Sequence, residues 1–105
     1  MNVKVLLTPE EKALGLQGLP RIPDDTIYVF VGPPVGGYFH SRNVPEPFDL
    51  AFLSSDRRVI CRGFLTPPND TAAVPVGAAY AIETKFGVLD QFIVLGKFTL
   101  KFSDA

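Results

Sequence analysis

The sequence has no tryptophan, one cysteine, one histidine and one methionine, and these scarcities exclude several classes of protein. The single cysteine, Cys61, cannot form an intramolecular disulfide, so nothing in the chain requires an oxidising compartment. A structural zinc site needs three or four Cys or His ligands at short spacings, and His40 and Cys61 do not supply them. We therefore predict no metal ion and no other cofactor.

A large excess of either charge is also missing, and so are long apolar runs. Ten basic and eleven acidic residues give a net charge of −1, without a long run of either sign. A nucleic-acid partner or an anionic membrane would require a basic surface, so we expect neither. The apolar stretch after Met1 is too short for a signal sequence or a membrane span. These features predict a soluble cytoplasmic protein without a signal peptide.

What the chain does have is glycine and proline, which divide it into short apolar segments. The 105 residues, with nine glycines and ten prolines, are expected to form one domain over 1–105. Alternating or continuous apolar patterns predict strands at 2–7, 26–31, 38–44, 48–53, 58–65, 79–84 and within 93–102, with a bulge at Gly63 and a turn or helical turn at 85–92. The fold class predicted is mainly β, a small single-domain β-barrel or sandwich with one short N-terminal helix.

The helix is predicted at about 9–16 from its capping residues. Thr8 is a favourable N-cap, Pro9 suits the first helical position, and Glu11 completes a capping box. Gly15 and Gly18 then end the helix. Cys61, which alternates with Val59, is interpreted as a small core residue.

The segment GYFHSRNVPEPFDLAF, residues 37–52, holds the only histidine among other polar residues. In a strand, successive side chains point to opposite faces. His40 would then share a face with Tyr38 and Arg42, and Ser41 would lie on the other face with Phe39 and Asn43. A nucleophile–base pair of Ser41 and His40 is geometrically poor in that arrangement, so we predict no catalytic residue.

Three stretches resemble the domain of unknown function 192 family. TPEEKALGLQGLPRIPDDTIYVF is similar to that family's opening, FHSRNVPEPFDLAF to its FWMKNT…PLDIAF, and AYAIE with two later glycines to its ending. The likeness covers about residues 3–102 and implies a mostly β, barrel-like domain with one short helix near its start and no established reaction. The matching positions are Phe39, Arg42, Asn43, Asp49, Phe52, Glu83, Gly87 and Gly96.

The chain also departs from the family pattern at several positions. His40 and Ser41 stand where the family has Trp and Met, Thr26 and Ile27 replace a Gly-Met pair, and Lys97 follows Gly96 where an acid is usual. If the family has a shared pocket at the Trp-Met strand, these changes imply that this chain has rebuilt it. The departures therefore favour a divergent, repurposed copy.

The favoured function is a non-catalytic structural or protein-interaction module. Because no catalytic arrangement emerges and the mean hydropathy is +0.21, apolar surface is expected to remain for a protein partner or a homo-oligomer. A subunit that decorates or cements a larger assembly such as a virus capsid would fit, with the virion as its location. The apolar stretch 66–79 is predicted to be a loop that either packs over one end of the domain or contacts a partner through Pro67, Pro68, Val74, Pro75 and Val76.

The alternative is a small-molecule-binding protein or enzyme with a polar site at the rim of the barrel. Its residues would be His40, Arg42, Asn43, Asp49 and Glu83. Arg42 and Asn43 would hold an anionic ligand, and His40 would act as acid or base. Equally, Arg42 could form a surface ion pair with Asp49 or Glu83. A concave pocket in which His40 and Arg42 converge would favour the binding function, and oligomers without a pocket would favour the interaction module.

Overall fold

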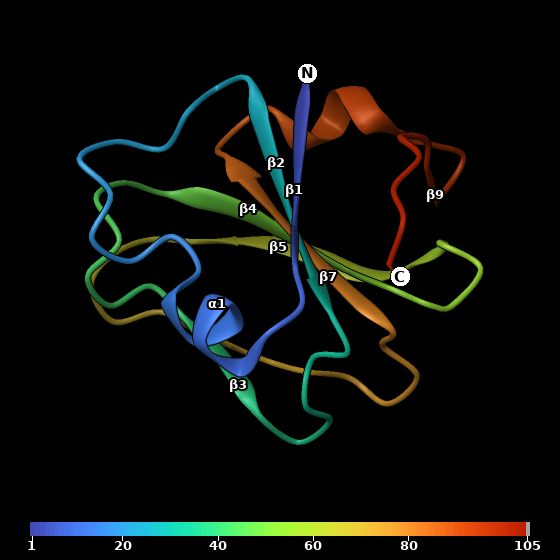
Figure 1. Cartoon of the computed structure of the whole chain (residues 1–105), viewed down its shortest axis with the longest axis horizontal. Coiled ribbons are helices and arrows are strands. Elements are labelled where there is room, and N and C mark those ends of the chain that lie inside the picture. Colours follow the sequence, from blue (N-terminus) through green and yellow to red (C-terminus); the bar gives the residue numbers. More distant parts are fainter. Residues whose placement is uncertain (105) are drawn as a thin grey trace.

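The computed structural model describes residues 1–104 and is built on one five-stranded mixed sheet (Figure 1). Its strands follow the order β1 (Asn2–Leu6), β2 (Thr26–Val31), β7 (Tyr80–Lys85), β4 (Phe48–Leu53) and β5 (Val59–Leu65). β1 runs parallel to β2, and the other neighbours are antiparallel. The mainly β class is confirmed, but β1 and β5 are edge strands, so the sheet is not a closed barrel. The last residue of the predicted domain, Ala105, lies outside the described residues.

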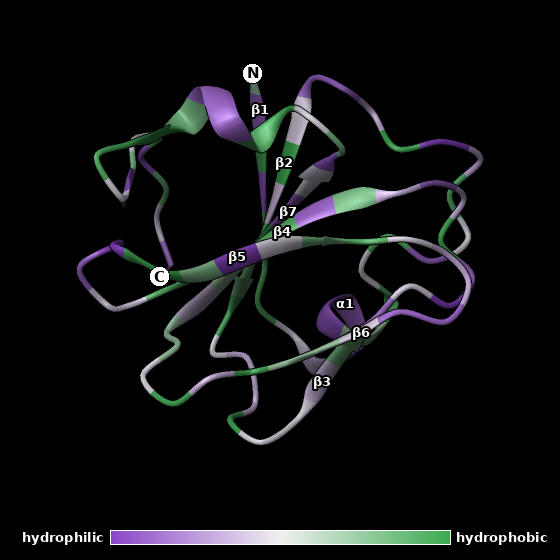
Figure 2. Cartoon of the chain, turned by 180° about the vertical axis from the view of Figure 1, so that it is seen from behind, coloured by the Kyte–Doolittle hydropathy of each residue, from purple (hydrophilic) through white to green (hydrophobic). Residues whose placement is uncertain are grey.

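Smaller elements cover the two faces of this sheet. Helix α1 (Pro9–Leu14) lies on one side, together with the two-stranded ribbon of β3 (Tyr38–His40) and β6 (Thr71–Ala73) (Figures 1 and 2). The 3-10 helix η1 (Leu89–Phe92) and the hairpin of β8 (Ile93–Val94) and β9 (Lys97–Phe98) supply residues to the other side. The segment predicted as a turn or helical turn at 85–92 thus contains a 3-10 helix, and the strands predicted within 93–102 form a hairpin. None of the helices in the described part of the chain has the length and apolar character needed to cross a membrane.

The capping residues of α1 behave as their types predict. The Thr8 hydroxyl accepts a hydrogen bond from the Glu11 amide at 3.1 Å, and the Glu11 carboxylate accepts one from the Thr8 amide at 3.0 Å. Gly15 ends the helix with a φ of 50°, and a Cβ at this position would lie 3.1 Å from the Phe30 ring. Glycine therefore permits both the turn and the close approach of the helix to the sheet.

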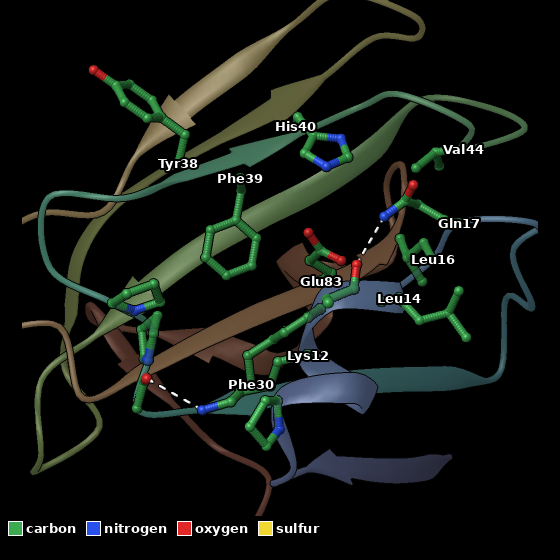
Figure 3. Close-up of a pocket in the computed structure, with 16 residues that line it drawn as sticks. Lys12, Leu14, Leu16, Gln17, Phe30, Tyr38, Phe39, His40, Val44 and Glu83 are labelled. Carbon is green, nitrogen blue, oxygen red and sulfur yellow. Dashed lines mark hydrogen bonds between the residues drawn. The ribbon is translucent and has the colours of Figure 1, made fainter.

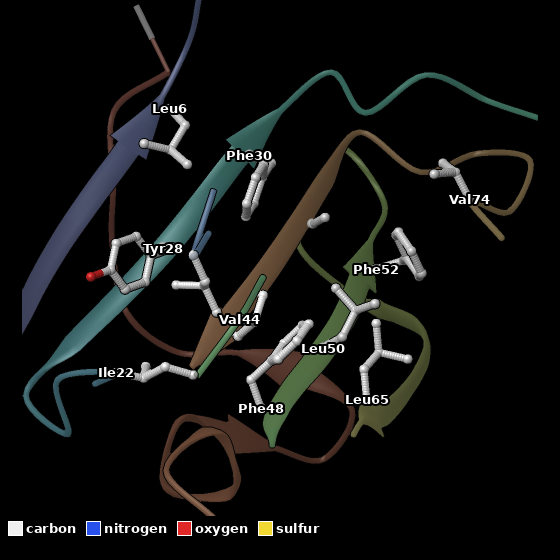
Figure 4. Packing of buried hydrophobic residues seen from close by; sticks show 12 residues of the cluster. Leu6, Ile22, Tyr28, Phe30, Val44, Phe48, Leu50, Phe52, Leu65 and Val74 are labelled. Atoms are coloured by element: carbon white, nitrogen blue, oxygen red, sulfur yellow. The ribbon is translucent and has the colours of Figure 1, made fainter. Parts of the chain in front are cut away.

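Alternate residues of the central strands build two separate cores. The first, which we call the cavity face, contains Phe30, Phe48, Leu50 and Phe52 and is completed by Leu16, Val44 and Val74 from the covering segments (Figure 4). The second, which we call the closed face, contains Ile27, Val29, Ala51, Leu53, Tyr80 and Ile82 and is covered by Leu89, Phe98, Leu100 and Phe102. Because β2 and β4 are buried on both faces, they read as nearly continuous apolar runs.

Some sequence predictions fail for local reasons. The strand predicted at 38–44 ends at His40, since Asn43 has a φ of 61° and turns the chain. The bulge lies at Ile60, which is left between the pairs Phe52–Cys61 and Leu53–Val59, and not at Gly63. Cys61 is exposed because β5 is an edge strand, so its interpretation as a core residue is wrong.

The stretch 66–79 is not a structureless loop. It contains β6, whose residues pair with β3 in the register Tyr38–Ala73 to His40–Thr71. The β-pairing of this ribbon was missed because Thr71–Ala73 is only three residues long and shows no resolvable alternation. The ribbon holds Phe39 over the cavity face, which positions one wall of the site described next.

Candidate functional site

A cavity of about 420 Å³ opens between α1, β3 and the cavity face of the sheet (Figure 3). Small-molecule sites in proteins occupy roughly 300–1,000 Å³ and are mostly apolar with a few polar groups. The lining here follows that pattern, with apolar residues from each surrounding element and one buried acid. Its main members are Lys12, Leu14, Leu16, Gln17, Phe30, Tyr38, Phe39, His40, Val44 and Glu83.

Glu83 is the buried acid of this cavity. It lies on β7, in the middle of the sheet, between Tyr28 of β2 and Leu50 of β4. Strand alternation places it on the cavity face together with Ala81. Only 3% of Glu83 is exposed, and its carboxyl group points into the space beneath Phe39 and His40 (Figure 3).

The Glu83 carboxyl group has no partner in the part of the protein that the structure describes. Among residues 1–104, no hydrogen bond or ion pair reaches it, while buried carboxyl groups in proteins are normally paired. Burial raises the pKa of Glu83 to about 8, because a low-dielectric environment disfavours the charged form. A strongly shifted acid inside a concave pocket is a recognised mark of a functional site.

Aromatic rings form the wall opposite the helix. Phe30 and Phe52 flank Ala81 in the register of the sheet, and the small alanine side chain leaves room above it. Phe39 fills part of this space, edge-on to Phe30 at 5.1 Å and to Phe52 at 5.5 Å between ring centroids. Tyr38 also lines the cavity and remains largely exposed.

The other polar groups of the lining are largely satisfied by the protein. The Lys12 ammonium donates to the Val31 carbonyl at 3.0 Å and lies 3.5 Å from that of Gly32. The Gln17 side-chain nitrogen, Nε2, donates to the Ala13 carbonyl at 2.8 Å. His40 accepts a hydrogen bond from the Arg42 amide through Nδ1 at 3.1 Å, which leaves Nε2 as the unused ring nitrogen.

Two of the five predicted ligand-binding residues, His40 and Glu83, meet in this cavity. Arg42 and Asn43 are exposed in the turn after β3 and do not line it. Asn43 instead ties the turn to the segment after α1, since its carbonyl accepts from the Gly18 amide at 2.9 Å and its side chain lies 3.5 Å from the Gln17 oxygen. His40 and Arg42 therefore do not converge in the way that the alternative with a polar site at the rim required.

Asp49, the fifth predicted residue, lies on the closed face. Its position on β4 alternates with Phe48 and Leu50, so the side chain points away from the cavity. It accepts a hydrogen bond from the Gly87 amide at 2.9 Å and another from the Leu89 amide. Burial raises the pKa of Asp49, and these bonds oppose the rise. Asp49 thus secures the turn before η1.

Ser41 has a structural position and no contact with the cavity. The residue is fully buried, and its hydroxyl donates to the Thr66 carbonyl at 3.0 Å and accepts from the Asp70 amide at 2.9 Å. The polar groups of His40, Ser41 and Arg42 therefore do not gather in one site. Sequence reasoning missed Lys12, Phe30 and Phe39 as lining residues, and only the departure from the family pattern at His40 pointed to this strand.

The predicted partner-contact residues differ in exposure. Val76 is 86% exposed and Pro68 is exposed, Pro67 and Pro75 are half-buried, and Val74 lies in the core. Burial removes Val74 from the set that a partner could contact. Groups of three or more His, Cys, Asp or Glu side chains able to bind a metal ion do not occur among residues 1–104.

Comparison with protein families gives one match that spans most of the chain. The model of DUF192, described as an uncharacterized ACR, matches residues 1–97. This range includes the cavity-face core, α1 and every lining residue of the cavity, while Phe98, Leu100 and Phe102 of the closed face lie beyond it. A search of curated proteins finds no significant match.

Two crystal structures share the fold. A protein of unknown function from Novosphingobium aromaticivorans DSM 12444 has a TM-score of 0.72 and 24% sequence identity, over 85% of this chain and 66% of that one. A protein from Sinorhizobium meliloti 1021, described as a candidate transcription regulator, has a TM-score of 0.72 and 20% identity, over 91% of this chain and 78% of that one. At these identities the likeness concerns the fold alone.

Proposed function

This chain belongs to the DUF192 family of uncharacterized proteins, and from the geometry of its cavity we propose that it binds a small molecule without transforming it. One observation carries this proposal. A buried carboxyl group without a partner among residues 1–104 lies at the floor of a mostly apolar cavity of about 420 Å³. Burying such a group costs free energy that a purely structural site would avoid, so a bound ligand accounts for it.

Binding is proposed in preference to catalysis because of the groups that reach the cavity. The described part of the chain contributes no serine, threonine or cysteine to its lining. Lys12 is bonded to backbone carbonyls, and the described structure gives Glu83 no oriented partner that would make it one half of an acid–base pair. The site therefore supplies recognition and shelter from water.

The proposal is tested with benzyl alcohol, a neutral probe small enough for the cavity. Titration into ¹⁵N-labelled protein is expected to shift amide resonances of cavity residues such as Gly15, Phe39 and Glu83. The variant Ala13→Phe, which places a ring in the mouth of the cavity, should weaken binding at least about tenfold, which corresponds to about 1.4 kcal/mol.

A matched variant makes this test specific. Ala73→Phe adds the same ring at a second hollow of about 220 Å³ between β5 and β6, so it should leave the affinity for benzyl alcohol unchanged. Shifts confined to the second hollow, or equal binding by both variants, would refute the proposed site.

A second candidate function is the protein-interaction module, including a subunit that decorates an assembly such as a virus capsid. It is favoured by exposed apolar side chains, above all Leu95 at 95% and Val76 at 86%, and by the exposed ring pair of Phe64 and Phe86. Light scattering separates the two functions, because a stable oligomer would bury these side chains and a monomer would leave them to solvent.

A further inference from the structure

The chemistry around Glu83 specifies the kind of ligand that would complete the cavity. A carboxyl group offers two acceptor oxygens, and in its ionised form it pairs most strongly with a cationic donor. The described residues, 1–104, bring no such donor to Glu83. Lys12, the cation in the lining, uses its ammonium group on the Val31 and Gly32 carbonyls.

The rings beside this acid suit the same ligand. Phe30 and Phe39 line the cavity together with Glu83, and Tyr38, which is largely exposed, adds a third ring at the opening. An ammonium group is attracted to the face of an aromatic ring, more strongly when it is removed from water. A buried acid surrounded by rings therefore provides both a counter-ion and a favourable lining for an ammonium group.

An anionic ligand fits these groups poorly. An anion would repel the ionised form of Glu83, and the Lys12 ammonium and the Gln17 side-chain amide both already bond to carbonyl oxygens. The unused nitrogen of His40 is a single donor. A neutral alcohol could bond to the protonated Glu83 carboxyl group but would add no ionic attraction.

We propose that the cavity takes a protonated primary amine on a small apolar body, with the ammonium group against the Glu83 carboxyl group and the body among the phenylalanine rings. This inference depends on the proposed binding function. Binding converts the protonated acid of the free protein into a carboxylate paired with the ligand, so one proton leaves Glu83 as the amine enters.

The titratable groups that surround Glu83 do not supply the proton that is released when the amine binds. Tyr28 faces it from β2, and Lys85 follows it on β7 but is paired with Glu46 at 3.6 Å. His40 approaches from β3 and Lys12 from α1, while β4 contributes the apolar Leu50. Only burial raises the pKa of Glu83; these neighbours do not alter it.

The test compares benzylamine, benzyl alcohol and phenylacetate, measured by calorimetry at about pH 7. Benzylamine is expected to bind at least tenfold more tightly than benzyl alcohol. In Glu83→Gln this advantage should disappear, while the affinity for the alcohol stays within about twofold. Asp49→Asn, which changes a buried acid on the closed face, should keep the preference for the amine.

A second measurement needs no variant. Below about pH 8 the affinity for benzylamine should rise up to tenfold per pH unit, with nearly one proton released per amine bound, because alkyl amines stay protonated over this range. Equal binding of amine and alcohol, or tightest binding of phenylacetate, would overturn the ammonium inference and leave the cavity as a binding site. If none of the three probes binds in the cavity, the proposed function itself fails.

Discussion

The two faces of one sheet differ in how their buried groups are satisfied. On the closed face, η1, the β8–β9 hairpin and the C-terminal segment cover the strands, and Arg57 stacks on the Phe102 ring at 3.8 Å while donating to the Phe102 carbonyl. On the cavity face, α1 and the β3–β6 ribbon cover the sheet but leave a space of about 420 Å³. The same strands therefore support one face that is filled and one that is left open.

The two buried acids, Asp49 and Glu83, make this difference concrete. Both lie on central strands, and 6% of Asp49 and 3% of Glu83 is exposed. Asp49 accepts backbone hydrogen bonds on the closed face, which is how a folded chain normally compensates a buried carboxyl group. On the cavity face, no described residue donates a comparable hydrogen bond to Glu83. Burial alone therefore does not distinguish a structural acid from a binding one, whereas the hydrogen-bond partner does.

We expect the greatest loss of stability from a substitution in the closed face. Phe98→Ala removes a buried ring between the β8–β9 hairpin and the sheet, and should lower the free energy of unfolding by about 3–5 kcal/mol. Urea denaturation measures this change. Leu14→Ala truncates a side chain that lines the cavity mouth and is 62% exposed, so it should change stability by no more than about 0.5 kcal/mol. Equal losses for both would mean that the two faces are packed alike.

The pH dependence of stability should also distinguish Glu83 from Asp49. The pKa of Glu83 is raised from 4.5 to about 8 in the folded protein, so between these values the folded state keeps a proton that the unfolded state has lost. Stability should therefore fall as pH rises through this window. From about pH 5 to about pH 7 the expected loss is roughly 2–3 kcal/mol, at about 1.4 kcal/mol per pH unit.

Two matched variants show which acid causes the dependence of stability on pH. Glu83→Gln carries no titrating proton and should give a nearly flat profile over the same range. Asp49→Asn should keep the slope, because the pKa of Asp49 rises from 3.8 and its direct bonds limit the rise. The lowered pKa values of Glu11, Asp56 and Asp104 act at more acidic pH. A slope that persists in Glu83→Gln would assign the titration to another group.

Much of the sheet could be predicted from local patterns. The continuous apolar run TIYVFV and the stretch FDLAFL became β2 and β4 with the expected bounds, because central strands need apolar side chains on both faces. The capping box of α1 also followed from three residue types. The pairing of the strands and the open edges of the sheet could not be predicted in this way. The partner of β3 is the short β6, and the parallel β1–β2 pair depends on contacts between residues distant in the sequence.

The site was harder to predict for a physical reason. Glu83 and Asp49 both appear in the sequence as single acids within apolar strands, and alternation alone does not say which face remains open. That depends on how Phe39 and Gly15 hold the covering segments above Phe30. The candidates near His40 were scattered by the turn at Asn43, so the true cavity shares only His40 and Glu83 with the predicted one.

The smallest expected effect concerns the cover of the cavity face. Helix α1 has no buried residue and is held by its caps, so it should open locally more easily than the sheet. Thr8→Ala removes the hydroxyl that accepts from Glu11 and should destabilise the helix by about 1 kcal/mol, equivalent to roughly fivefold faster amide exchange at Lys12 and Gly15. Amide exchange in β7 should stay unchanged. The matched control is Thr26→Ala, since the Thr26 hydroxyl bonds to the neighbouring Asp25; this variant should leave exchange at Lys12 and Gly15 unchanged. If β7 were accelerated equally, helix and sheet would unfold as one unit, and the cavity could not open through α1 without the closed face opening too.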